Sequence, residues 1–123
     1  MISNSLVSVV DDDESVRESL PDLLRSFGLD AQPFASAEEF LASESLKHTG
    51  CLILDIAMPG MSGLDLQQEL ARQERNIPIV FITARSVDRV RPQVLKRGAV
   101  ACLFKPFSET AILEAVNTAL GRN

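Results

Sequence analysis

The stretch CLILDIAMPGMSG, residues 51–63, decides how the rest of the chain is organised. Its first four residues form an apolar run, which is typical of a buried strand in a parallel sheet. This strand brings one carboxylate, Asp55, to its C-terminal end, where open α/β sheets bind their ligands. The Met-Pro-Gly sequence at 58–60 then breaks regular structure, and Ser62 is placed to cap a following helix. We therefore expect Asp55 at a strand-to-loop junction, exposed at its tip and held by a buried strand.

Composition and charge narrow the class of protein. The chain has 123 residues, 46% hydrophobic and 24% charged, which is ordinary for one soluble globular domain. Its net charge of -5 argues against direct nucleic-acid binding, because gripping a phosphate backbone needs clustered Lys and Arg. No secretory leader and no apolar run of about 18 residues is present, so we expect a cytoplasmic protein without membrane contact. Cys51 and Cys102 lie in expected interior strands without metal-ligand spacing, so we interpret both as buried thiols.

Strand and helix patterns alternate five times along the chain. We expect strands at residues 6–10, 29–34, 51–54, 78–83 and 100–104, each followed by a segment with helical spacing of apolar residues. Five such units predict an α/β fold in one domain, residues 1–123: a doubly wound, five-stranded parallel sheet with helices on both faces. The core-facing side of the first helix is expected to include Val16, Leu20, Leu23, Leu24 and Phe27.

Polar side chains follow the ends of four of these strands. They are Asp11 and Asp12 after the first strand, Asp55 after the third, Thr83 after the fourth and Lys105 after the fifth. Three clustered carboxylates repel one another unless a cation is present, and Mg²⁺ prefers carboxylate oxygens. With that charge neutralised, Asp55 can attack a phosphoryl donor, while Lys105 and Thr83 can bind phosphate oxygens. An acidic run such as residues 11–13, taken alone, is more often a solvated helix start.

The chain resembles the receiver domain of bacterial two-component response regulators, and within that family the FixJ-like subgroup. Four stretches in this order carry the resemblance: VVDDD at 9–13, LILDIAMPGMSG at 52–63, PIVFITA at 78–84 and GAVACLFKPF at 98–107. The resemblance implies a flavodoxin-like, CheY-like (βα)5 fold and a role in two-component signal transduction. A sensor histidine kinase would transfer a phosphoryl group to the domain in the presence of Mg²⁺ (or Mn²⁺). The domain would catalyse only its own phosphorylation and dephosphorylation, and would not otherwise be an enzyme.

The same resemblance implies a metal site. Asp12 would bind the metal directly and Asp11 through water, and the backbone carbonyl of Ala57 would be another ligand. Asp55 would be both a metal ligand and the phosphoacceptor. We assign Asp13 to the start of the first helix.

It also implies how the phosphoryl group is bound and sensed. Thr83 would be the switch hydroxyl, and Lys105 the phosphate-binding ammonium, aimed in the family by a cis bond to the following proline. In the family, the side chains two places after the phosphoacceptor and two after the switch Thr set access of the hydrolytic water. Here these are Ala57 and Arg85, and we expect slow self-dephosphorylation because Ala57 cannot orient a water.

Three residues depart from the family's pattern. Cys102 stands where a Tyr or Phe ring commonly reports the switch, and Phe104 stands where the subgroup usually has an acid. Phe104 beside Cys102 either forms an apolar patch for a partner or packs under the fourth helix. Pro92 falls within the expected fourth helix, so we predict a shortened helix that starts near Arg91 after a long mobile loop from Arg85.

These residues together predict a phosphoryl-accepting switch that controls an output, expected to be transcription. Its signalling face, and a homodimer contact, are expected on the fourth helix, fifth strand and fifth helix. A C-terminal DNA-binding domain outside this chain is expected, with a stand-alone receiver as the alternative. Two other functions stay open. One is a receiver-like interaction module that works unphosphorylated, which Cys102 and Pro92 favour; the other is a Mg²⁺-dependent phosphohydrolase, which the lack of a second acid at 56–58 opposes.

Overall fold

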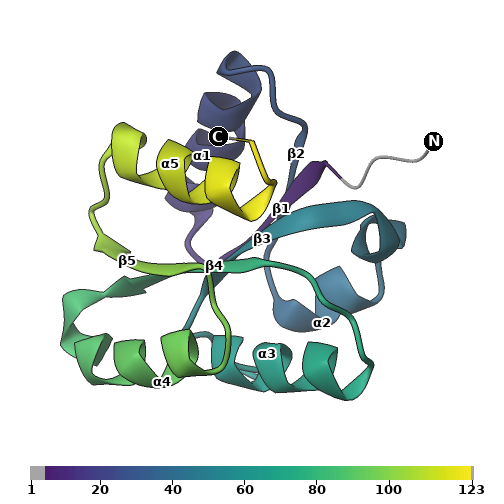
Figure 1. The fold of residues 1–123 in the computed structure, drawn as a ribbon, viewed down its shortest axis with the longest axis vertical. Coiled ribbons are helices and arrows are strands. Elements are labelled where there is room, and N and C mark those ends of the chain that lie inside the picture. Colours follow the sequence, from purple (N-terminus) through teal and green to yellow (C-terminus); the bar gives the residue numbers. More distant parts are fainter. Residues whose placement is uncertain (1–4, 123) are drawn as a thin grey trace.

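Five parallel strands form one sheet through the centre of the molecule (Figure 1). The computed structural model describes residues 5–122, apart from the side chains at positions 87 and 88. The strands are β1 (Leu6–Val10), β2 (Ala31–Phe34), β3 (Thr49–Asp55), β4 (Ile79–Ala84) and β5 (Ala101–Lys105). They lie in the order β2-β1-β3-β4-β5, and every neighbouring pair is parallel. This order confirms the predicted doubly wound sheet, whose strands all end at one edge.

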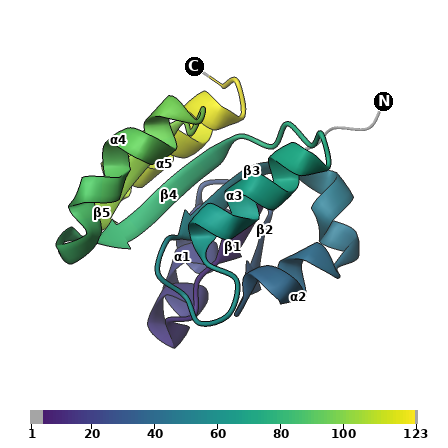
Figure 2. The ribbon, with the colours of Figure 1, turned by 90° about the horizontal axis from the view of Figure 1, so that it is seen from below.

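Helices cover both faces of this sheet (Figures 1 and 2). On one face lie α1 (Glu14–Ser26) and α5 (Glu109–Ala119); on the other lie α2 (Ala37–Leu41), α3 (Gly63–Arg72) and α4 (Arg91–Lys96). Two 3₁₀ helices, η1 (Glu44–His48) and η2 (Arg85–Val90), complete the chain. Across the described range 5–122, no helix combines the length and apolar character needed to cross a bilayer.

Each face of the sheet buries its own apolar cluster. The cluster under α1 and α5 includes Val9, Leu24, Ile53 and Ile112, and the cluster under α2, α3 and α4 includes Phe40, Leu52, Phe81 and Val94. Neighbours on β3 therefore point to opposite sides, as alternation along a strand requires. Because both faces are buried, the strands are the near-continuous apolar runs seen in the sequence.

Polar caps fix where the helices begin. Asp13 caps α1, in agreement with the sequence analysis, and Ser108 caps α5. At α3, the Ser62 hydroxyl accepts from the Asp65 N–H at 3.1 Å, and the Asp65 carboxylate accepts from the Ser62 N–H at 3.0 Å. This reciprocal capping box fixes the point at which the loop after β3 ends.

The prediction that Phe27 faces the core is wrong. Its side chain is 57% exposed, whereas Leu20 and Leu24 of the same stripe are buried. The helix ends at Ser26, and Phe27 is the C-cap residue, so helical spacing no longer fixes its direction. Gly28 then turns the chain in the left-handed conformation at φ 82°.

The fourth helix starts where the proline predicted. It runs from Arg91 to Lys96 with Pro92 in its first turn. The preceding segment differs from the expected loop, because residues 85–90 form the 3₁₀ helix η2. The missing N–H of Pro92 would interrupt an α-helix continuing from residue 85, and short 3₁₀ turns are a common way to lead into a helix.

Both cysteines are buried free thiols, as predicted, but one lies in a different kind of strand. Cys51 belongs to the inner strand β3, while Cys102 belongs to β5, which is an edge strand. Cys102 is only 2% exposed because its side chain packs in the same cluster as Val94 of α4. The helix α4 therefore helps to exclude water from this thiol, although β5 is at the edge of the sheet.

Candidate functional site

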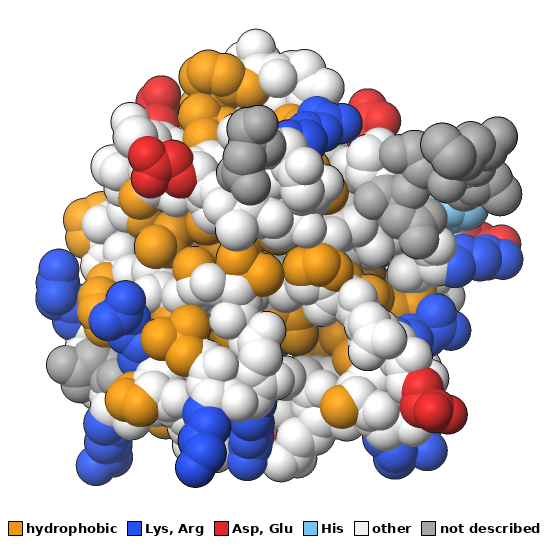
Figure 3. All heavy atoms as spheres, viewed as in Figure 1, with side chains coloured by type: hydrophobic (Ala, Val, Ile, Leu, Met, Phe, Trp, Pro, Cys, Tyr) orange, Lys and Arg blue, Asp and Glu red, His pale blue; other side chains and the backbone are white. Residues whose placement is uncertain are grey.

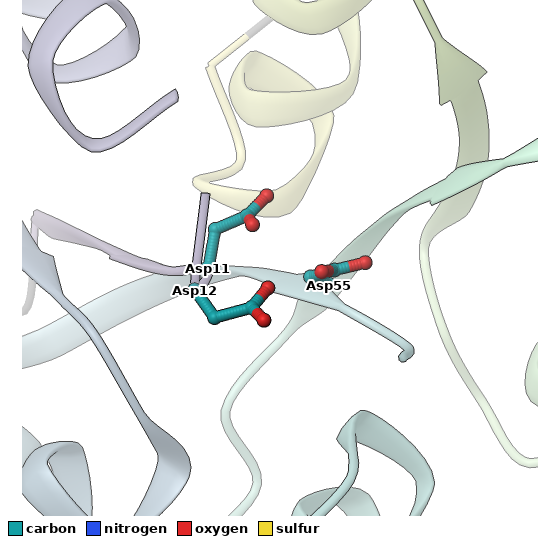
Figure 4. Close-up of side chains that lie close together, drawn as sticks. All are labelled: Asp11, Asp12 and Asp55. Carbon is teal, nitrogen blue, oxygen red and sulfur yellow. The ribbon is translucent and has the colours of Figure 1, made fainter. Parts of the chain in front are cut away.

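The C-terminal ends of β1 and β3 bring three carboxylates together (Figure 4). The two strands pair through Val10 and Leu54, so Asp11 and Asp55 follow at adjacent positions. One oxygen from each of Asp11, Asp12 and Asp55 lies within 4.8 Å of the other two. Asp11 is fully buried and Asp12 is exposed, so the cluster opens to solvent on the Asp12 side.

Asp55 is buried, and the expectation of an exposed tip is therefore wrong. The residue is only 6% exposed. The loop after β3 returns directly beside it: the Gly63 N–H donates to the Ile56 carbonyl at 2.9 Å. A Cβ at position 63 would collide with the Asp55 carbonyl oxygen, so the close return requires glycine there.

Lys105 supplies the one ammonium close to this cluster among the described residues. Its Nζ lies 2.8 Å from Asp11 Oδ2 and 3.8 Å from Asp55 Oδ2. Burial alone would lower the pKa of Lys105, but the ion pair with Asp11 and the charge of Asp55 outweigh it and raise that pKa. The peptide bond from Lys105 to Pro106 is cis.

The charge of the cluster remains unbalanced. Burial, followed by the negative charge of Asp11, raises the pKa of Asp55 to about 7, even though Lys105 opposes the shift. One ammonium among three carboxylates leaves an excess of negative charge, which a bound cation would relieve. Three oxygen donors of this kind suit a hard divalent cation such as Mg²⁺. The residues present therefore fit the metal that the sequence analysis expects, and Ala57 lies exposed in the adjoining loop.

Thr83 brings a hydroxyl to the end of β4. It pairs in register with Phe104, one position beyond the pairing of Asp55 with Ile82. The residue is fully buried, and its Oγ1 has no hydrogen-bond partner within the described part of the chain. Leaving a buried hydroxyl unpaired costs about 1–3 kcal/mol. The hydroxyl is therefore available to a ligand that enters the site.

Phe104 is covered by arginines and does not form an open apolar patch. The guanidinium of Arg85 lies 5.0 Å from its ring centroid and that of Arg91 lies 5.8 Å away. Arg91 Nε also donates to the carbonyl of Cys102 at 3.2 Å. Both cation–π contacts join β5 to the segment that follows Thr83, and they place the ring beside the start of α4.

Two residues near the site carry no recognisable signal in the sequence. Arg17 of α1 donates from Nη1 to the carbonyl of Asp11 at 3.1 Å. Glu38 of α2 accepts from the N–H of Met61 at 3.0 Å, in the loop after β3. Both residues are charged and lie on helices, where such side chains are usually exposed to solvent. Their contacts with the site are therefore identified only by the three-dimensional structure.

Comparison with known proteins gives the family. The model of the response regulator receiver domain matches residues 7–117. The chain belongs to this family. As a receiver domain it has an all-parallel sheet and an acidic cluster at the strand ends, in agreement with the sequence analysis.

The relatives include regulators of the FixJ-like subgroup. Nodulation protein W of Bradyrhizobium diazoefficiens is 46% identical over 98% of this chain and 53% of its own length. Response regulator protein TmoT of Ectopseudomonas mendocina is 44% identical over 94% of this chain and 53% of its own. The receiver domain thus spans about half the length of these curated relatives.

Solved structures agree with the fold. The FixJ-N crystal structure superposes with a TM-score of 0.86 at 37% identity, covering 96% of this chain and 94% of that one. The response regulator StyR superposes with a TM-score of 0.88 at 47% identity, covering 96% of this chain and 60% of that one.

Proposed function

We propose that this receiver domain, residues 1–123, is a phosphoswitch that accepts a phosphoryl group on Asp55. The observation that carries the proposal is the setting of Asp55, which is buried beside two more carboxylates and the ammonium of Lys105. A carboxylate so placed has no evident structural use, because its own charge is disfavoured there. Asp55 is thus the nucleophile of the proposed reaction.

The three acids have different tasks in this proposal. Asp12 and Asp55 would hold Mg²⁺ (or Mn²⁺) together with the Ala57 carbonyl, and Asp11 would do so through water. The bound cation supplies positive charge to the phosphoryl oxygens and to the acids. Asp11 also keeps Lys105 in place through their 2.8 Å ion pair.

The remaining residues bind what Asp55 receives. As a bond forms between phosphorus and an Asp55 oxygen, the bond from phosphorus to the donor breaks, and its electron pair leaves with the donor. Lys105 then faces phosphoryl oxygens as a point charge, and Thr83 donates its unpaired hydroxyl to one of them. A shift of Thr83 toward the phosphoryl group changes the segment that begins at Arg85. Slow loss of the group, due to Ala57, is part of the proposal.

The donor and the output belong to the whole protein. We propose a sensor histidine kinase as the donor and transcription as the output. Two relatives of this chain, TdiR and FixJ, are named as transcriptional regulatory proteins. Output would pass through α4, β5 and α5, either to a homodimer partner or to a DNA-binding domain.

A second candidate, an interaction module that works unphosphorylated, is favoured by Cys102. A buried cysteine has no ring that can exchange between two positions, so it cannot report the state of Thr83 in the way a Tyr or Phe can. For the phosphoswitch, the contact of Arg85 with Phe104 offers a different connection between Thr83 and β5, because Arg85 follows Thr83 by two residues.

Intact-mass measurement with the small donor acetyl phosphate and Mg²⁺ tests the proposal. We expect one phosphoryl adduct on the wild-type protein and none on Asp55→Asn. The exposed Asp30, at the other end of the sheet next to the start of β2, provides the matched control, and Asp30→Asn should retain the adduct. A protein that forms no adduct would favour the phosphorylation-independent module.

A further inference from the structure

A carboxylate from α2 reaches the loop that follows β3. The Oε2 atom of Glu38 accepts a hydrogen bond of 3.0 Å from the backbone N–H of Met61, 23 residues further along the chain. The same carboxylate fills the space beside Gly60, where a Cβ would lie 2.8 Å from Oε2. Gly60 has φ 74°, a left-handed backbone conformation that favours glycine.

The loop, residues 56–62, is fixed at its other points by different means. Its beginning is held by the 2.9 Å hydrogen bond from Gly63 to Ile56, and its end by the capping box of Ser62. Ile56 and Met58 are buried in the apolar cluster under α2, α3 and α4. Ala57 is exposed between these two buried residues. The outer part of the loop, at Gly60 and Met61, is tied to the rest of the fold by a polar contact that comes from Glu38.

We infer that Glu38 is a positioning residue for the metal site. It holds the loop that carries Ala57, the proposed carbonyl ligand, although it is not itself a member of the acidic cluster. Partners outside the ligand shell that orient ligands commonly change metal affinity by about 10–100-fold when removed. The inference rests on the proposed metal site, and its consequence for the loop can be measured without metal.

The neighbouring residue provides a matched control. Glu38 and Glu39 both lie in the first turn of α2 and both are exposed. Replacing either residue by Ala removes one negative charge from the start of the same helix. The two variants therefore change the long-range electrostatics and the interaction with the helix dipole alike. In the described structure, the Glu39 side chain takes part in no hydrogen bond or salt bridge, and its backbone N–H donates to the Ser36 hydroxyl.

Two readouts on the folded proteins test the inference. The first is Mn²⁺ affinity by calorimetric titration: we expect Glu38→Ala to bind about 10-fold more weakly than Glu39→Ala, at the lower limit for partners outside the ligand shell. Glu38→Gln should recover most of the loss, because its amide oxygen can still accept from Met61. The second is hydrogen exchange of the Met61 amide without metal, which should be faster in Glu38→Ala and unchanged in Glu39→Ala.

The outcomes separate this inference from the proposed function. If the wild type binds no Mn²⁺, the proposed metal site fails, and Met61 exchange still decides whether Glu38 holds the loop. If the wild type binds Mn²⁺ and the two alanine variants have equal affinity, the inference is overturned while the metal site stands. Equal Met61 exchange in both variants would likewise overturn it.

Discussion

Asp55 is a carboxyl group whose ionisation is disfavoured by burial and by the neighbouring charge of Asp11. Its pKa of about 7 means that the ionised form is disfavoured in the folded chain relative to the unfolded chain, where the ordinary value is 3.8. The folded pKa is raised, so this group's contribution to stability is greatest below about pH 4 and is lost as the pH rises through about 7. Without metal, the domain therefore becomes less stable over this range because of Asp55.

Replacement of Asp55 by Asn should thus stabilise the metal-free domain. At about pH 8 with a chelator, we expect the free energy of unfolding of Asp55→Asn to exceed that of the wild type by roughly 1–3 kcal/mol. The gain should shrink at about pH 5, where the wild-type carboxyl is largely protonated. Urea denaturation measures both values, and Asp30→Asn is the control. Equal or lower stability of Asp55→Asn at the higher pH contradicts this account of the charge balance.

Thr83 offers a second test at the same scale. Because its buried hydroxyl has no partner among the described residues, Thr83→Val should raise the free energy of unfolding by about 1 kcal/mol. The shape of the side chain is preserved by this change. The control is Thr49→Val, which should lower the free energy of unfolding instead. Chemical denaturation of the wild type and of the two variants measures both changes.

The comparison is informative because Thr49 is paired. Its Oγ1 lies 2.8 Å from Ser8 Oγ and donates to the Ser45 carbonyl. Both threonines are buried in strands of the same sheet. If Thr83→Val loses as much stability as Thr49→Val, the Thr83 hydroxyl already has a partner in solution, and it is not free to bind a phosphoryl oxygen.

The sequence predicts which side chains lie close together better than it predicts their surroundings. Asp11, Asp12, Asp55 and Lys105 follow from one rule, that parallel strands end at the same edge of a sheet. The burial of Asp55 could not be predicted, since it depends on how closely the loop returns at Gly63. The contact from Glu38 to Met61 joins distant residues with no pattern in common.

At the scale of elements, α4 is a short helix whose start is set by a proline. It has only six residues, and Pro92 occupies its first turn, where a missing N–H has no partner to lose. The residue pattern predicted this start, because proline is restricted by its own geometry. The 3₁₀ turns of η2 were not predicted, because a short segment without apolar periodicity gives no signal for them.

The position of the proline gives a prediction for α4. Pro92→Ala should change the free energy of unfolding by less than about 1 kcal/mol, whereas Leu95→Pro should cost roughly 3 kcal/mol. Leu95 is 37% exposed, so its loss removes less packing than loss of the fully buried Val94 would. Thermal or urea unfolding of both variants checks this. A large change on Pro92→Ala would show that α4 does not begin at Arg91 in solution.

Over the whole molecule, charge is unevenly distributed. Although the net charge is -5, five of the twelve Lys and Arg residues fall within residues 85–97. These are the exposed side chains of Arg85, Arg89, Arg91, Lys96 and Arg97. Lys and Arg side chains gather along the edge of the molecule where α4 lies (Figure 3). A partner that docks on η2 and α4 therefore meets basic side chains. These residues are far in sequence from Asp11 and Asp12, which follow β1.

The family follows from the whole chain because its motifs occur in order. The runs that end in Asp11, Asp55 and Lys105 each predict only a strand when taken singly. Their order and spacing predict the sheet, its ligand edge and the family together, and the family match over residues 7–117 agrees. The exposure of Phe27 and the contact of Arg85 with the Phe104 ring depend on local geometry, and neither was predicted.

The most direct test of the account is the metal dependence of phosphorylation. Purified protein is mixed with acetyl phosphate in Mg²⁺ or in a chelator, and the fraction carrying a phosphoryl group is followed by intact mass over time. We expect the adduct to form in Mg²⁺, to be nearly absent in the chelator and to be absent from Asp55→Asn in both. An adduct that forms equally well in the chelator, or that persists in Asp55→Asn, would contradict the assignment of Asp55 and its acidic neighbours as a metal-dependent phosphoacceptor site.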